Sequence, residues 1–66
     1  MMIQQLIDEI DVWASKERDY QSQLQRMTST ATPATLAAMR KHIDQAKKTR
    51  VELEGLLSEE LDALAA

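Results

Sequence analysis

The sequence predicts an all-α fold, a single antiparallel two-helix coiled-coil hairpin that is completed by self-association or by a helical partner. Three observations support this prediction. Helix-forming residues dominate the composition, which contains one glycine and one proline. Helix-breaking residues cluster only at 28–33. On both sides of this break, apolar residues recur at alternating spacings of three and four, the pattern of a coiled-coil seam.

The first helix is predicted over about residues 2–28. Its seam is apolar except at Glu17, which fills the one vacant position. The apolar members are Ile3, Leu6, Ile10, Trp13, Tyr20, Leu24 and Met27. The sequence Thr-Ser-Thr-Ala-Thr-Pro follows, and the residue before a proline is pushed out of the α region. The helix should therefore end before this segment.

A turn over 29–32 and a second helix over about 33–64 complete the single domain predicted for 1–66. Thr32 can cap the second helix, and Pro33 suits its first position because that position needs no N–H. Arg50 and Glu60 occupy polar seam positions. The apolar seam residues are Leu36, Met39, Ile43, Ala46, Leu53, Leu57 and Leu64. So short a turn between two long helices predicts that they run antiparallel.

One register places apolar residues of the two seams opposite each other. Facing residue numbers have a constant sum in an antiparallel pair, and a sum of 63 makes five layers apolar on both sides. These layers are Met27–Leu36, Leu24–Met39, Tyr20–Ile43, Ile10–Leu53 and Leu6–Leu57. Such agreement favours this register strongly.

The same register predicts a polar layer of Trp13, Glu17 and Arg50. Glu17 lies opposite the small Ala46, which leaves space for an ion pair with Arg50, whose guanidinium would lie near the Trp13 ring. We expect such a pair to set the register, because a buried pair adds little net stability. In the alternative, both charged side chains extend to solvent.

A chain of 66 residues without cysteine needs more than its own core to be stable. Ile7, Leu56 and Leu61 lie beside the seam, where two helices alone leave them exposed. Exposed apolar patches usually mark contact surfaces. We therefore predict that these three residues bind a partner, which is either a helix of another protein or a second copy in a structural four-helix bundle.

Charge is segregated along the chain, whose formal net charge is −3. Segments 1–12 and 51–66 contain no lysine or arginine, so the end of the hairpin with the termini should be acidic. Two interpretations follow: a basic amphipathic partner docks there, or these are solvated outer faces. The basic residues Arg40, Lys41, Lys47 and Lys48 either match Glu17 and Asp19 within the hairpin or contact phosphates. Matching is favoured, so a small RNA-binding bundle is the weaker alternative.

No motif for catalysis, cofactor binding or metal binding is present in the sequence. His42 has no cysteine or carboxylate at ligand spacing, and we expect it at the surface. We therefore predict a non-enzymatic protein without a cofactor or a metal. The apolar runs are too short to span a membrane, and the N-terminus does not have the pattern of a signal peptide. We therefore expect a cytoplasmic protein, or one that is exported without a cleaved signal.

The length, the break between Thr28 and Pro33, and the leucine-rich second helix resemble the small hairpin co-chaperones of bacterial type III secretion. The resemblance covers most of the chain in its architecture and carries over no functional residues. It implies a cytoplasmic co-chaperone that keeps a needle subunit soluble. Needle subunits are themselves short helical hairpins with a proline-containing turn, so the resemblance extends to both sides of that complex.

Overall fold

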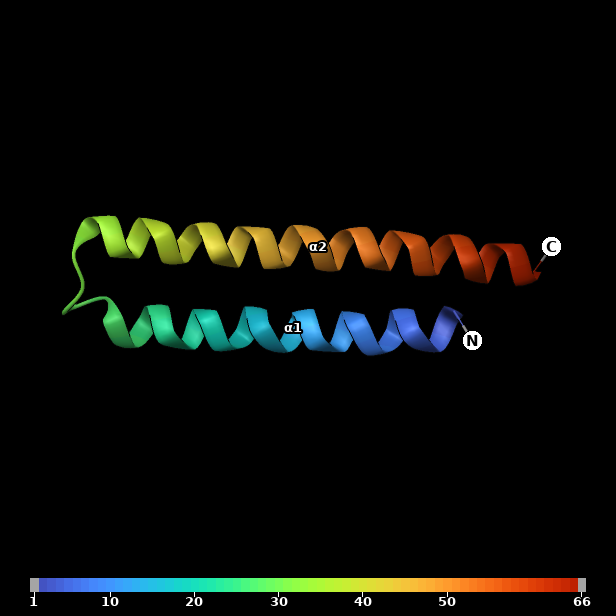
Figure 1. The fold of residues 1–66 in the computed structure, drawn as a ribbon, viewed down its shortest axis with the longest axis horizontal. Coiled ribbons are helices and arrows are strands. Elements are labelled where there is room, and N and C mark those ends of the chain that lie inside the picture. Colours follow the sequence, from blue (N-terminus) through green and yellow to red (C-terminus); the bar gives the residue numbers. More distant parts are fainter. Residues whose placement is uncertain (1, 66) are drawn as a thin grey trace.

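The protein is an all-α helical hairpin, as the sequence predicts. The computed structural model describes residues 2–65, with side chains from residue 3 onward. Helix α1 spans Met2–Met27 and helix α2 spans Pro33–Ala65. The two helices lie side by side in opposite directions and form a rod of 52 × 14 × 12 Å (Figure 1). We call the end with the two termini the open end and the end with the turn the loop end.

Backbone and side-chain hydrogen bonds close the turn at the loop end. The amides of Thr30 and Ala31 both donate to the Met27 carbonyl, at 3.0 and 2.8 Å, and end α1 one residue before the predicted boundary. The Thr28 hydroxyl donates to the Leu24 carbonyl at 2.7 Å. No residue of 2–65 has a positive φ, so this turn requires no glycine.

Thr32 caps α2 as predicted. Its Oγ1 accepts a hydrogen bond from the Thr35 amide at 3.2 Å, and its carbonyl accepts one from the Leu36 amide at 3.0 Å. This side chain satisfies a helix N–H that has no partner within the helix, while Pro33 at the first position has no N–H to satisfy.

We expect Thr32→Ala to lower the free energy of unfolding by about 1 kcal/mol, the usual value of a side-chain cap. Thr30→Ala is the matched control, because only the backbone amide of Thr30 takes part in the turn. Thermal melts followed by circular dichroism measure both. Equal melting temperatures for the two variants would mean that the cap contributes nothing.

The seam follows the predicted positions with one exception. In α1, every predicted seam residue from Ile3 to Met27 is buried or half-buried, Glu17 among them, and in α2 the same holds from Leu36 to Glu60. Leu64 is the exception, with 73% of its surface exposed. In the register with a sum of 63, Leu64 has no facing residue, because α2 extends past the start of α1 at the open end (Figure 1). The heptad pattern continues there, but the partner helix does not.

The interior of the hairpin is thin. Among the described residues, only Leu6 and Ala46 are buried, with 8% and 1% of their surfaces exposed. The other seam residues are half-buried, because two helices enclose a seam from two directions only. Stability of the isolated hairpin is therefore marginal, as expected for a chain of 66 residues.

Candidate protein-interaction surface

A polar layer interrupts the seam at Arg50. Its Nε donates to Oε2 of Glu17 across the hairpin at 2.7 Å, and its Nη1 donates to Oε1 of Glu54 on the same helix at 2.7 Å. The side chains of Arg50 and Glu17 are 24% and 13% exposed. The hydrogen bond to Glu17 raises the pKa of Arg50 above its ordinary value. Of the two arrangements considered from the sequence, the structure has the ion pair.

The predicted contact between Arg50 and Trp13 is not the one that forms. The cation over the Trp13 ring is Lys16, with its Nζ 4.4 Å from the ring centroid. Lys16 lies three residues after Trp13, and residues at this spacing are neighbours on a helix. Arg50 is held instead by its two carboxylates, because Glu54 lies four residues along the same helix and competes for the guanidinium.

The ion pair has a predicted effect on stability that can be tested directly. We expect Arg50→Leu to lower the melting temperature by several degrees, because it leaves the half-buried Glu17 without its partner. Replacing both Glu17 and Arg50 by leucine should restore the melting temperature to the parent value or above, because the layer then packs as an apolar seam. Melts by circular dichroism distinguish these outcomes. A double variant that is as unstable as the single one would show that the pair itself stabilises the fold.

The three residues predicted to bind a partner are exposed, but they do not form one surface. Ile7 is 38% exposed, and Leu56 and Leu61 are each 49% exposed. Leu56 and Leu61 are five residues apart, which places them about 140° apart around the helix at about 100° per residue. They therefore lie on opposite sides of the seam. Closeness to the seam in the sequence does not show this. A residue that directly precedes a seam residue lies on one side of the seam, and a residue that directly follows one lies on the other.

The exposed aliphatic residues fall on these two sides, which we name after one member of each. In an antiparallel pair, equivalent flanking positions of the two helices meet on the same side of the seam. The Ile7 flank carries Ile7, Val51, Leu61 and Leu64, and the Leu56 flank carries Val12 and Leu56. All six lie toward the open end, whereas the loop half exposes no large aliphatic side chain among the described residues.

The Leu56 flank also contains a groove near the middle of the rod. It has a volume of about 510 Å³ and is open to solvent. It is lined by Trp13, Lys16 and Tyr20 of α1 and by His42, Gln45, Ala46, Lys48, Thr49 and Glu52 of α2. The Tyr20 and His42 rings meet across it, with centroids 6.0 Å apart at an interplanar angle of 35°. The seam pattern indicates Tyr20 only as a core residue and His42 only as a surface residue, so the sequence does not predict this groove.

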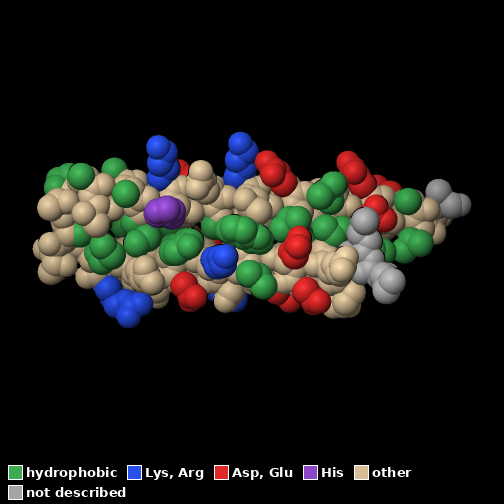
Figure 2. All heavy atoms as spheres, in the orientation of Figure 1, with side chains coloured by type: hydrophobic (Ala, Val, Ile, Leu, Met, Phe, Trp, Pro, Cys, Tyr) green, Lys and Arg blue, Asp and Glu red, His purple; other side chains and the backbone are tan. Residues whose placement is uncertain are grey.

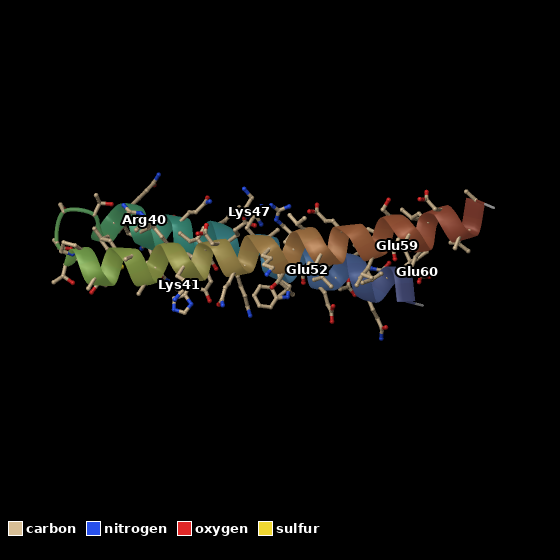
Figure 3. The ribbon with its side chains drawn as sticks, turned by 90° about the horizontal axis from the view of Figure 1, so that it is seen from above. Arg40, Lys41, Lys47, Glu52, Glu59 and Glu60 are labelled. Carbon is tan, nitrogen blue, oxygen red and sulfur yellow. The ribbon has the colours of Figure 1, made fainter. Side chains whose placement is uncertain are left out.

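Charges are segregated on the surface as the sequence indicates. On the face drawn in Figure 2, lysine and arginine gather on the loop half and acidic side chains gather toward the open end. Seen from above α2 in Figure 3, Arg40 and Lys47 lie along one edge of the helix, and Lys41 and Glu52 lie toward the other. Both edges of the rod therefore carry charge.

The favoured intramolecular charge matching of the basic stretch is wrong for four of its residues. Within residues 2–65, the ion pairs involve Arg50 alone, so Arg40, Lys41, Lys47 and Lys48 form none. Lys41 and Lys48 occupy the heptad position farthest from α1. In the register with a sum of 63, the α1 residues nearest to Arg40 and Lys47 on their flank are Gln21 and Ala14, and neither is acidic. These four cations are available to an external partner.

Across residues 2–65 there is no group of three or more histidine, cysteine or acidic side chains placed to hold a metal ion. Neither described helix combines the length and the apolar character that crossing a membrane requires.

Comparisons of the chain with protein-family models, with curated proteins and with solved structures find no match. The geometry alone therefore defines the class: an all-α helical hairpin with a thin seam, two partly apolar flanks and oppositely charged halves.

Proposed function

We propose that this protein is a non-enzymatic protein-interaction module whose Ile7 flank binds an amphipathic helix of another protein at the open end. The exposed aliphatic cluster on this flank is the observation that carries the proposal. Ile7, Leu61 and Leu64 stay 38%, 49% and 73% exposed at the end of a hairpin in which two described residues are buried. A third helix laid along this flank removes these side chains from water.

The charge of the open end indicates what kind of helix fits. Glu59, Glu60 and Asp62 lie near the C-terminus of α2, where the helix dipole is negative, and no basic residue occupies its last turn. Cations are favourable at such an end. A partner helix with an apolar stripe bordered by lysine or arginine meets both requirements.

The type III secretion co-chaperone that the sequence resembles is one form of this function. In that form the hairpin acts in the cytoplasm and shields the apolar face of an aggregation-prone helical subunit. A structural homo-oligomer is the second candidate, and it is favoured by the opposite charges of the two halves of the rod.

A site-specific photo-crosslinker tests the module directly in the native cell. Placed at Leu61, it should capture one discrete protein, and placed at Gln25, an exposed position of the loop half, it should not. The captured protein is then purified and titrated against the hairpin. We expect Leu61→Asp to weaken its binding at least about tenfold, the loss expected when the burial of a half-exposed leucine is removed.

The charge-matched control is Gln25→Asp, which adds the same charge at an exposed position far from the open end. It should bind like the parent. The proposal fails if the crosslinker at Leu61 captures only copies of this chain, or if Leu61→Asp binds the captured protein as tightly as the parent does.

A further inference from the structure

We propose that a second copy of this chain covers the Leu56 flank, in a head-to-tail dimer in which Leu56 of each copy enters the groove of the other. This dimer gives a geometry to the second candidate function, the structural homo-oligomer, and it uses the flank opposite the one assigned to the module. The exposed Val12 and Leu56, the groove and the distribution of charge on this flank carry it.

The two halves of the rod have opposite charge, and the boundary between them crosses both helices at the same level. All eight lysine and arginine residues lie within 16–50, and only three of the eleven acidic residues lie there. The sign therefore changes between Asp11 and Lys16 in α1 and between Arg50 and Glu52 in α2. These points face each other across the hairpin, near the middle of the rod. A second copy turned end over end about this level places each acidic half against a basic half.

The individual charges of the Leu56 flank agree with one such axis. In a two-fold dimer with α1 over α1 and α2 over α2, facing residues have a constant sum within each helix. The residue numbers of Glu9 and Lys16 in α1 sum to 25, which puts the axis between Val12 and Trp13. In α2, the residue numbers of Glu52 and Lys48, and those of Glu59 and Lys41, both sum to 100, which puts the axis at Arg50. Lys48 reaches this flank from the outer face of α2 and lines the groove, and Lys41 lies toward the same edge of α2 as Glu52 (Figure 3). Trp13 and Arg50 are opposite each other in the hairpin register, so a single axis produces all three pairs.

The same axis brings the apolar residues of this flank to the groove. It places Leu56 level with Asp44 of the other copy, between His42 and Ala46, which line the groove beside Tyr20. It also places Val12 over Trp13 of the other copy. Leu56 and Val12 are 49% and 52% exposed in the isolated hairpin. The dimer buries both of them and fills the groove twice, once for each copy.

The contact is large enough to be specific. In this dimer the two rods, each 52 × 14 Å, lie side by side with the axis near the middle of each. They overlap along about 40 Å, counted at 1.5 Å of rise per helical residue. A footprint of this length and width covers about 500 to 600 Å² on each copy, or about 1,100 Å² in total, which exceeds the roughly 1,000 Å² expected of a biological interface. The opposite arrangement, with both open ends together, brings acidic segments against acidic segments and is disfavoured.

Charge exchange tests the geometry. One variant carries Glu9→Lys, Glu52→Lys and Glu59→Lys, and the other carries Lys16→Glu, Lys41→Glu and Lys48→Glu. Each variant alone should dimerise at least about 100-fold more weakly than the parent, because every facing pair becomes repulsive. An equimolar mixture should form a heterodimer, since all of its facing pairs are again opposite in charge. Sedimentation equilibrium and native mass spectrometry measure both, and circular dichroism establishes that each variant is helical.

A second pair of variants separates this interface from the Ile7 flank. Leu56→Asp should abolish the parent dimer and leave binding of the crosslinked partner protein unchanged, whereas Leu61→Asp should do the reverse. If an exchanged variant fails to fold, this pair still decides the question. The dimer proposal is overturned if the parent is monomeric at millimolar concentration, if the mixed exchange variants stay monomeric, or if Leu61→Asp abolishes the dimer and Leu56→Asp does not.

Discussion

Ile43→Asp should abolish the cooperative helical melt of this protein. Ile43 is a half-buried seam residue that the register places opposite Tyr20. The substitution removes apolar burial and puts a carboxylate into a layer that has no cation, which together cost about 3 to 5 kcal/mol. A chain of this length has a total stability of about 3 to 10 kcal/mol. One substitution of this kind is therefore enough to unfold a marginal hairpin.

Gln25→Asp is the control, because it adds the same charge at an exposed position of the loop half. Far-ultraviolet circular dichroism during heating should show a cooperative transition for Gln25→Asp and a weak, gradual signal for Ile43→Asp. Leu24→Asp, in the neighbouring layer, should behave like Ile43→Asp. A parent-like melt for either of the two seam variants would mean that the seam described here does not hold the helices together.

Leu6→Ala and Leu64→Ala should differ greatly in stability, although the heptad pattern assigns both leucines to the seam. Leu6 is 8% exposed, and Leu64 is 73% exposed on the part of α2 that extends past α1. Truncating a buried leucine costs about 2 to 5 kcal/mol, and we expect the low end of this range because the thin rod can relax around the site. Truncating the exposed one should change stability by less than about 0.5 kcal/mol.

Urea titrations of the two variants measure this difference as a shift of the unfolding midpoint at constant slope. A loss for Leu64→Ala as large as that for Leu6→Ala would indicate that the end of α2 is covered, either by a partner or by a different register. The same comparison therefore tests the overhang seen in the structure.

The fold was predictable from the sequence because its determinants are local and repetitive. The threonine-rich segment before Pro33 ends one helix and caps the next, and the three-and-four spacing marks the buried side of each. The ion pair between Glu17 and Arg50 was also within reach, because the register brings the two residues one turn apart across a small alanine.

Other parts of the site depend on competition between neighbours, which the seam pattern does not describe. Lys16 takes the Trp13 ring because it lies one turn away on the same helix, and Glu54 shares Arg50 for the same reason. The division of Leu56 and Leu61 between two flanks required the angular positions of the residues. The groove beside Tyr20 and His42 required both helices to be placed together.

Because few side chains are buried in this rod, its folding depends on the concentration of the molecules that bind the folded form. A protein that is only marginally stable by itself is stabilised by any molecule that binds its folded form. The free energy of unfolding rises by about 1.4 kcal/mol for each tenfold increase in the concentration of that molecule above its dissociation constant. Newly synthesised copies that find no associate will open often and will be removed by proteases, while assembled copies persist. The cellular amount of this protein should then follow the supply of whatever it assembles with.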